Sequence, residues 1–338
     1  MDGHPPGNPP VRRYGGGFAP MTRRGFLRSS ITMLAASGLS CRPWMTDVPA
    51  RRASVRFGLV ADCHYANAPT AGTRFYRDSL GKLDECVGVV NAEKARFLVE
   101  LGDLKDQGNP PVETDTLRYL RDIEQRFQRF EGPTYHVLGN HDMDSLSKGQ
   151  FLENVTNTGI EATRSYYSFD FEGLHFVVLD ANHKSDGTDY DHGRFDWRDA
   201  NVPGPQLQWL QEDLDGGMIP IRIGNGRETI PKRVRDDGRP TIVFVHQLLD
   251  GSGDHYVNNA REVRAILEKP GRVLAVFQGH QHNGAYSQIN GIHYFTLNAL
   301  VEGPYPQHNA FTMVEVHPSL DITVTGYRDT PSRELVHA

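Results

Sequence analysis

The sequence predicts an α/β fold, because short apolar runs alternate with amphipathic segments from Ser54 onward. The runs have the length of strands, and the segments between them repeat their apolar residues at helical steps. The chain has 338 residues, of which 38% are hydrophobic. That composition is sufficient for a large core in one or two domains.

Six short apolar runs predict the strands of this fold. They are residues 55–61, 96–101, 134–138, 174–180, 241–246 and 272–278. The third run is followed by Asn140, His141 and Asp142. These three residue types are poor strand formers, so we expect that strand to stop at Leu138.

Four segments between the runs predict helices. In the first of them Leu80, Leu83, Val87 and Val90 recur at steps of three and four residues, which places them on one helical face. The four segments are residues 75–92, 113–130, 205–214 and 258–269.

Late in the chain the pattern changes to antiparallel pairs. Residues 284–298 predict a hairpin with Asn290 and Gly291 at its turn, and residues 310–328 predict a second pair. From Ser54 onward we find no internal repeat and no obvious linker, so we expect one domain over residues 54–338. Residues 216–240 are expected to be an inserted glycine- and arginine-rich loop, which is either solvated or faces an anionic substrate.

The first residues differ in kind from this body. Residues 1–20 are rich in Gly and Pro and have no apolar periodicity, which is typical of a disordered leader. The basic stretch TRRGFLR at 22–28 is followed by apolar and small residues up to position 40. That order describes an export signal, although a basic amphipathic start to a helix is the alternative.

The paired arginines, followed by Phe26 and Leu27, resemble a twin-arginine signal. We therefore expect a leader and signal over residues 1–41, a linker over residues 42–53, and the twin-arginine export machinery as a partner. The mature protein would be periplasmic or extracellular. Cys41 offers a lipid-attachment site, and the sequence leaves a soluble form and a lipid-anchored form both open.

The chain after residue 41 is acidic. The first 41 residues hold five arginines and one aspartate, which leaves 31 basic and 41 acidic residues in the remainder. Binding to nucleic-acid polymers or anionic membranes needs a positive face, so we expect neither. No uninterrupted apolar stretch approaches the roughly 18 residues of a membrane span. Cys63 and Cys86 are too few for a disulfide framework.

Polar side chains follow five of the predicted strands, at the point where each strand ends. In open α/β sheets ligands bind beyond the carboxyl ends of the strands, so we expect these side chains to share one edge. Each motif alone has a simpler reading, since Gly-Asn and Gly-Asp are common in turns and a histidine after a strand is usually structural. The ordered set favours a site. Its members are Asp62, His64, Asp103, Asn140, His141, Asp142, His246, His280 and His282.

The donor types in this set indicate a metal centre. Carboxylate, amide oxygen and imidazole without thiolate suit Mn, Fe or Zn. Seven candidate ligands are too many for one ion and sufficient for two that share a bridging carboxylate. The candidate ligands are Asp62, His64, Asp103, Asn140, His246, His280 and His282. Two such ions can clamp the attacking and departing oxygens of an in-line displacement at phosphorus.

The motifs DCH at 62–64, GD at 102–103, GNHD at 139–142, His246 and GHQH at 279–282 together resemble the calcineurin-like metallophosphoesterases. The resemblance implies a four-layer αββα sandwich of two mixed sheets with a dinuclear site at the strand ends. It also implies a role for each residue, with two divalent or trivalent transition-metal ions, manganese foremost and iron or zinc as alternatives.

The implied roles divide the ligands into two groups joined by Asp103. Asp62, His64 and His282 would bind the first ion, Asn140, His246 and His280 the second, and Asp103 would bridge them. His141 would contact the phosphoryl oxygen or protonate the leaving group. Asp142 would hold the ring of His141.

Further segments resemble the manganese-dependent ADP-ribose/CDP-alcohol diphosphatase branch, which often has glutamine in the place of His64. These segments are residues 73–83, 166–180, 206–210, 291–304 and 308–311. The resemblance implies a phosphohydrolase that cleaves a small phosphorylated substrate by in-line attack of a metal-bridging hydroxide, with nucleotide diphosphate conjugates as candidates. Phosphomonoesterase or phosphodiesterase activity on other small phosphates is the alternative, and a non-catalytic binding scaffold is the remaining one.

Overall fold

Two six-stranded sheets pack face to face in the computed structural model, which describes residues 54–215, 218–222, 229–233 and 238–337. The expected leader, signal and linker lie outside the described residues. The first sheet has the order β14 (Arg333–Leu335), β13 (Ile322–Arg328), β12 (Ala310–Val316), β1 (Val55–Val60), β2 (Leu98–Glu100) and β3 (Thr134–His136). The second has the order β10 (Asn283–Ile289), β11 (Ile292–Asn298), β9 (Val273–Gln278), β8 (Thr241–Phe244), β5 (Leu174–Val178) and β4 (Tyr167–Phe171).

Both sheets are mixed, and each contains one group of adjacent parallel strands. β1, β2 and β3 run parallel, with Gly58 opposite Leu98 and Glu100 opposite His136. β5, β8, β9 and β11 also run parallel to one another. The remaining strands join antiparallel at the edges of these parallel groups. Because parallel strands end at the same edge, the residues that follow them are brought together.

The core between the sheets is aromatic. The ring of Phe57 on β1 meets Phe176, Phe244 and Phe277 of the second sheet edge-on, at centroid distances of 5.6, 6.0 and 6.3 Å. All four side chains are fully buried. Edge-to-face pairs of this kind add to the free energy gained by burying the apolar area.

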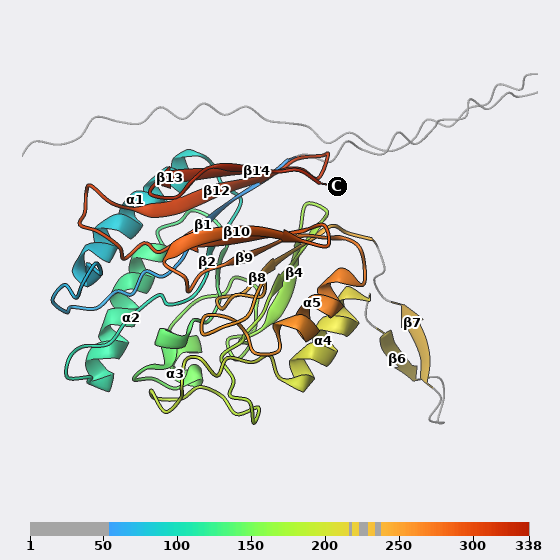
Figure 1. Ribbon diagram of the computed structural model, residues 1–338, viewed down its shortest axis with the longest axis horizontal. Helices are drawn as coiled ribbons and strands as arrows, with labels where there is room; N and C mark the ends of the chain where they lie inside the picture. The colour runs from blue at the N-terminus through green and yellow to red at the C-terminus, as the bar shows by residue number, and fades with distance from the viewer. Residues whose placement is uncertain (1–53, 216–217, 223–228, 234–237, 338) are drawn as a thin grey trace, which may run out of the picture. The chain divides into compact units, whose positions relative to one another are not determined.

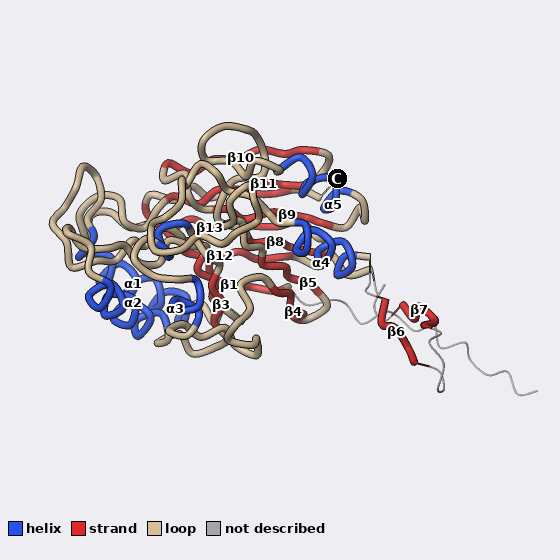
Figure 2. The backbone as a smooth tube through the Cα atoms, turned by 90° about the horizontal axis from the view of Figure 1, so that it is seen from below, coloured by secondary structure: helices blue, strands red, loops and turns tan. Residues whose placement is uncertain are grey.

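Helices cover the two outer faces. α1 (Ser79–Ala92), α2 (Glu113–Phe127) and the short α3 (Lys148–Leu152) pack on the first sheet, and α4 (Gly204–Leu214) and α5 (Ala260–Glu268) pack on the second. Figures 1 and 2 show α1 and α2 on one side of the strands and α4 and α5 on the other. The predicted four-layer αββα sandwich is confirmed. None of the helices among the described residues has both the length and the apolar character needed to cross a membrane.

The predicted hairpin at 284–298 is formed by β10 and β11. Asn290 and Gly291 turn between them with φ values of 51° and 84°, the left-handed region that this pair of residues adopts readily. The predicted pair at 310–328 is β12 and β13. The expected loop at 216–240 contains a two-stranded sheet of β6 (Met218–Arg222) and β7 (Thr229–Arg233), which the sequence analysis did not predict.

Candidate metal centre

The ends of β1, β2, β3, β8 and β9 meet at one edge, and the polar residues that follow them lie together. Past β1 and β2 the backbone pairing continues, since Asp62 N donates to Gly102 O at 3.0 Å and His64 N to Asp103 O at 2.8 Å. Past β8 and β9, Gly279 N donates to His246 O at 3.1 Å. The strand ends therefore hold the candidate ligands in fixed backbone positions.

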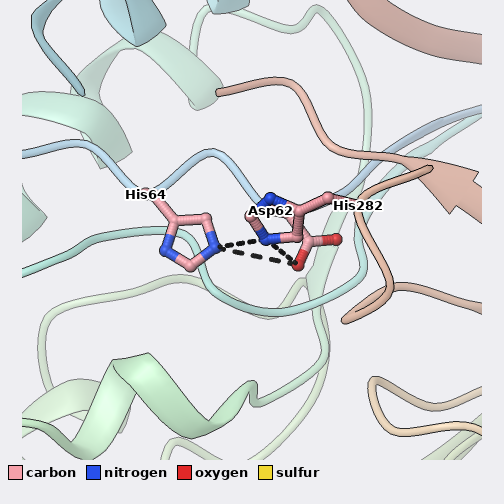
Figure 3. Close-up of side chains that lie close together, drawn as sticks. All are labelled: Asp62, His64 and His282. Carbon is pink, nitrogen blue, oxygen red and sulfur yellow. Dashed lines mark hydrogen bonds and ion pairs between the residues drawn. The ribbon is translucent and has the colours of Figure 1, made fainter. Parts of the chain in front are cut away.

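Asp62, His64 and His282 form the first group of ligands (Figure 3). The Nε2 atoms of the two imidazoles are 3.2 Å apart. Asp62 Oδ1 lies 3.8 Å from the Nε2 of His64 and 3.6 Å from that of His282. Three donor atoms from two sheets thus point into one small space.

Asp103, His246 and His280 form the second group. Asp103 Oδ2 lies 3.1 Å from His246 Nε2 and 3.6 Å from His64 Nε2, so a single carboxylate oxygen faces both groups. This is the position that a bridging ligand needs. Asn140 starts the short 3₁₀ helix η2 (Asn140–Met143) after β3, and its Oδ1 is buried with no hydrogen-bond partner among the described residues.

The residues fit the two ions that the sequence predicts. His280 Nε2 and Asn140 Oδ1 are both buried and have no hydrogen-bond partner in the described part of the chain. A buried polar atom without a partner costs about 1–3 kcal/mol, and a coordinated cation removes that cost. Burial alone would raise the pKa of Asp103, but His246 and His141 outweigh it and hold that pKa well below the ordinary value. Asp103 is therefore a carboxylate, as a bridging ligand must be.

Three of the four imidazoles are held by an outer partner on their other ring nitrogen. His282 Nδ1 is 2.6 Å from Glu302 Oε1, and His64 Nδ1 is 3.3 Å from Asp106 Oδ2. The Nδ1 of His246 is 2.8 Å from the carbonyl oxygen of Leu101. Such partners fix the tautomer and leave Nε2 free for a metal ion.

Neither outer carboxylate is among the residues predicted from the sequence. Asp106 stands three residues after Asp103, in the same strand-end motif. Its position in the sequence was therefore sufficient to predict that it lies near the site. Glu302 lies 20 residues from His282, in the loop between β11 and β12, and no local pattern marks it.

His141 lies beside the first group, with its ring centroid 4.7 Å from that of His64 and its side chain 27% exposed. Its Nδ1 is 2.6 Å from Asp144 Oδ2. Burial acts to lower the pKa of His141, but Asp103 and Asp144 outweigh it and raise that pKa to about 10. These carboxylates favour the protonated form of the ring, and the side chain is partly open to solvent.

The prediction that Asp142 holds the ring of His141 is wrong, because Asp144 makes that contact. Residues three apart lie on the same side of a 3₁₀ helix, whereas adjacent residues point to different sides. The buried carboxylate of Asp142 instead accepts backbone N–H groups from Gly139 at 2.8 Å and from Asp103 and Leu104 at 3.1 Å each. It fastens the end of β3 to the end of β2, so its role is to position the backbone.

The backbone at the ligands is unusual. Asp62, His64, Asp103 and His280 all have φ between 45° and 68°, a left-handed region that residues other than glycine rarely adopt. Each such residue costs on the order of 1 kcal/mol and persists only where the surroundings enforce it. Gly139 is required here for another reason, since a Cβ at that position would collide with the backbone nitrogen of Asp103.

Two aromatic rings border the second group on its open side. Trp197 is 37% exposed, and its ring centroid lies 5.5 Å from that of His280. His255 is also exposed, with its ring 5.2 Å from His280 and 5.3 Å from Trp197. Neither residue was predicted from the sequence, because each lies in a loop outside the strand-end motifs.

The chain belongs to the calcineurin-like phosphoesterase family, whose pattern matches residues 55–284. It is 29% identical over 294 residues to a manganese-dependent ADP-ribose/CDP-alcohol diphosphatase of Oryza sativa subsp. japonica, covering 78% of this chain and 88% of that protein. The Homo sapiens protein of the same name is 25% identical over 300 residues, covering 78% and 87%. A dimetal phosphatase from Danio rerio has the same fold, with a TM-score of 0.68 and 19% identity over 84% of this chain and 99% of that one.

These similarities confirm the predicted resemblance to the family and to this branch of it. The chain is accordingly a metal-dependent phosphohydrolase. The donor set of the two groups, together with manganese-dependent relatives, fits two transition-metal ions.

Proposed function

We propose that this phosphohydrolase cleaves the diphosphate linkage of a small nucleotide conjugate. The observation that carries the two-ion chemistry is the position of Asp103 Oδ2, which faces His246 on one side and His64 on the other. Asp62, His64 and His282 would hold the first ion, and Asn140, His246 and His280 the second. When bound, the two ions supply a nucleophile from water at neutral pH and neutralise charge on the phosphoryl group.

His141 is the residue of the chain that acts on the leaving group in this proposal. Its protonated ring is fixed by Asp144 and lies at the open side of the first group. It can donate a hydrogen bond to a phosphoryl oxygen, or give its proton to the departing oxygen. Asp106, 3.9 Å from His141 Nδ1, adds a second carboxylate that favours the charged ring.

The nucleotide part of the proposal has two supports. The curated relatives described above are named as ADP-ribose/CDP-alcohol diphosphatases. In this chain the exposed rings of Trp197 and His255 lie next to His280, where each presents an aromatic face beside the candidate metal centre. A nucleobase can stack on such a surface.

A substrate panel tests this proposal. The Mn²⁺-loaded chain should hydrolyse ADP-ribose or a CDP-alcohol with a higher kcat/KM than cyclic nucleotides or phosphate monoesters. Asp103→Ala and His141→Ala should each lower the activity by at least about 100-fold, because one removes a shared ligand and the other a proton donor. His317→Ala, which changes an imidazole bonded to Thr323 in the β12–β13 turn, is the matched control. Equal or faster turnover of simple monoesters would overturn the diphosphate assignment.

We also propose that the chain is exported by the twin-arginine machinery and acts in the periplasm or outside the cell. The motif at 22–28 and the apolar residues after it support this localisation. Replacing Arg23 and Arg24 by lysine should leave the full-length precursor inside the cell, as seen by fractionation and immunoblotting. If Cys41 carries a lipid, the Cys41→Ala protein should move from the membrane fraction to the soluble one. An unchanged distribution of the double-lysine variant would contradict the export proposal.

A further inference from the structure

Asn182 lies behind the metal centre and joins two of the strand ends that carry ligands. It follows β5 and is fully buried. Its side-chain Nδ2 donates to the carbonyl oxygen of Leu138 at 2.7 Å, and its Oδ1 accepts from Gln247 Nε2 at 2.7 Å. Leu138 stands two residues before the ligand Asn140, and Gln247 directly follows the ligand His246.

The orientation of this amide is fixed by a neighbouring carboxylate. Asp180 Oδ1 accepts from both the backbone N and the Nδ2 of Asn182, at 2.9 and 3.1 Å. A carboxylate only accepts hydrogen bonds, so the NH₂ group must face Asp180 and Leu138 and the oxygen must face Gln247. Lys148 Nζ, 2.6 Å from Asp180 Oδ2, keeps that carboxylate charged and in place.

The lysine also accounts for a cluster that could be mistaken for a third metal site. Asp180, His183 and Asp189 have donor atoms close enough together to bind an ion. The ammonium group of Lys148 occupies their centre, 2.5 Å from Asp189 Oδ1 and 3.3 Å from His183 Nε2. A positively charged side chain therefore already stands where an ion would bind, and the cluster anchors the residues beside Asn182.

The two ligand-bearing ends that Asn182 joins belong to different sheets. β3 is in the first sheet and β8 is in the second. The sheets contact each other mainly through apolar side chains, and such contacts are non-directional. A pair of metal ligands on opposite sheets needs a directional contact to hold its separation, which buried hydrogen bonds provide.

We propose that Asn182 is a positioning residue for the second metal ion, setting the distance between Asn140 and His246. The inference rests on the two-ion site of the proposed function. Among the described residues, Asn182 has no hydrogen bond to Asp62, His64 or His282. Its loss should therefore weaken binding of the second ion and leave binding of the first nearly unchanged. Outer partners of metal ligands typically change affinity by about 10–100-fold, and we expect an effect of that size.

The test compares Asn182→Leu with Gln206→Leu in the full chain. Gln206 is an equally buried amide that also holds the end of β5, since its Oε1 accepts from Asp180 N at 2.9 Å and its Nε2 donates to Asp180 O at 2.7 Å. It connects β5 to α4 and touches none of the metal ligands. Titration with Mn²⁺ by calorimetry gives the affinity of each ion, and electron paramagnetic resonance distinguishes a spin-coupled pair from a single Mn²⁺.

Wild type and Gln206→Leu should bind two ions and show the coupled spectrum. Asn182→Leu should bind one ion with nearly normal affinity and a second about 10–100-fold more weakly, with the single-ion spectrum at low Mn²⁺. Two ions bound normally by Asn182→Leu, or equal losses in both variants, would overturn the inference.

Gln247→Leu supplies a second measurement that does not depend on the folding of Asn182→Leu. It removes only the hydrogen bond between Gln247 and Asn182. It should selectively lower the affinity for the second ion, by a smaller factor than Asn182→Leu. No selective change in this variant would also count against Asn182. If the wild-type chain itself binds only one ion, the two-ion basis of the proposed function fails, which is a result distinct from failure of the positioning role.

Discussion

Lys82 offers a direct test of how the fold supports the metal centre. This residue of α1 is fully buried, and its Nζ donates to the carbonyl oxygens of Leu300, Glu302 and Gly303 at 2.7 Å each. These residues form the loop that places Glu302 against His282. One ammonium group therefore holds the loop that orients a metal ligand.

Lys82→Met keeps the length of the side chain and removes all three hydrogen bonds. A buried acceptor without a partner costs about 1–3 kcal/mol. Leu300 is fully buried, whereas Glu302 and Gly303 are partly exposed and can bond to water, so their carbonyl groups contribute at the low end of that range. We expect a total loss of about 3–5 kcal/mol, the size seen when one partner of a buried charged contact is removed.

Urea unfolding followed by circular dichroism measures this loss. The control is Lys269→Met, the same chemical change at an exposed lysine that pairs with Asp215 at 2.9 Å, which should cost less than about 1 kcal/mol. Binding of the first Mn²⁺ should weaken in Lys82→Met and stay normal in the control. A loss below about 1 kcal/mol for Lys82→Met would refute the reasoning, because the three contacts would then have no net effect.

Three further expectations follow from other contacts. Glu302→Ala should weaken the first Mn²⁺ by about 10–100-fold in calorimetry and spare the second, because only His282 loses its outer carboxylate. His175 Nδ1 lies 2.7 Å from Asp170, and His175 Nε2 lies 2.7 Å from Asp213. Burial acts to lower the pKa of His175, but the two aspartates outweigh burial and raise that pKa above 6.5. The ion pairs therefore stabilise the fold fully below pH 6.5, and this stabilisation is lost as the pH rises through the folded-state pKa. His175→Gln should therefore cost about 2 kcal/mol in urea unfolding at pH 6 and clearly less at pH 9, and an equal cost at both would contradict the ion pairs. AMP should quench the fluorescence of the wild type and of Trp209→Phe, but not of Trp197→Phe, and quenching that survives in Trp197→Phe would remove Trp197 from the substrate surface.

The fold and the positions of the metal ligands could be predicted from the sequence, because both depend on local patterns. Apolar runs show where strands are, and a parallel strand delivers whatever follows it to a known edge of the sheet. Asp62, Asp103 and His246 could be placed near one another in this way before any coordinates. β4 and β14 were not predicted, because β4 is an edge strand that is mostly only partly buried and β14 has only three residues.

Two kinds of side-chain contact could not be predicted from the sequence. One joins residues that are far apart in the chain, and the other depends on local helix geometry. Asp144 replaces Asp142 at the ring of His141 because the turn after β3 is a 3₁₀ helix, a detail that residue types do not specify. Glu302 and Asn182 reach the site from loops that become neighbours only when both sheets are packed. Such residues have no motif, and their function is visible only as a hydrogen bond.

The outer partners make the two halves of the centre unequal. The imidazoles of the first group are each held by a carboxylate, Asp106 or Glu302, whereas His246 is held by a neutral carbonyl group. A carboxylate partner raises the basicity of the ring and adds negative charge near the ion, so the first group should bind its cation more tightly. The second ion then depends more on geometry than on charge, and geometry is what the buried amide of Asn182 fixes. We therefore expect the first group to bind its ion before the second group does. The reverse order would mean that the charges of Asp106 and Glu302 do not decide the affinity.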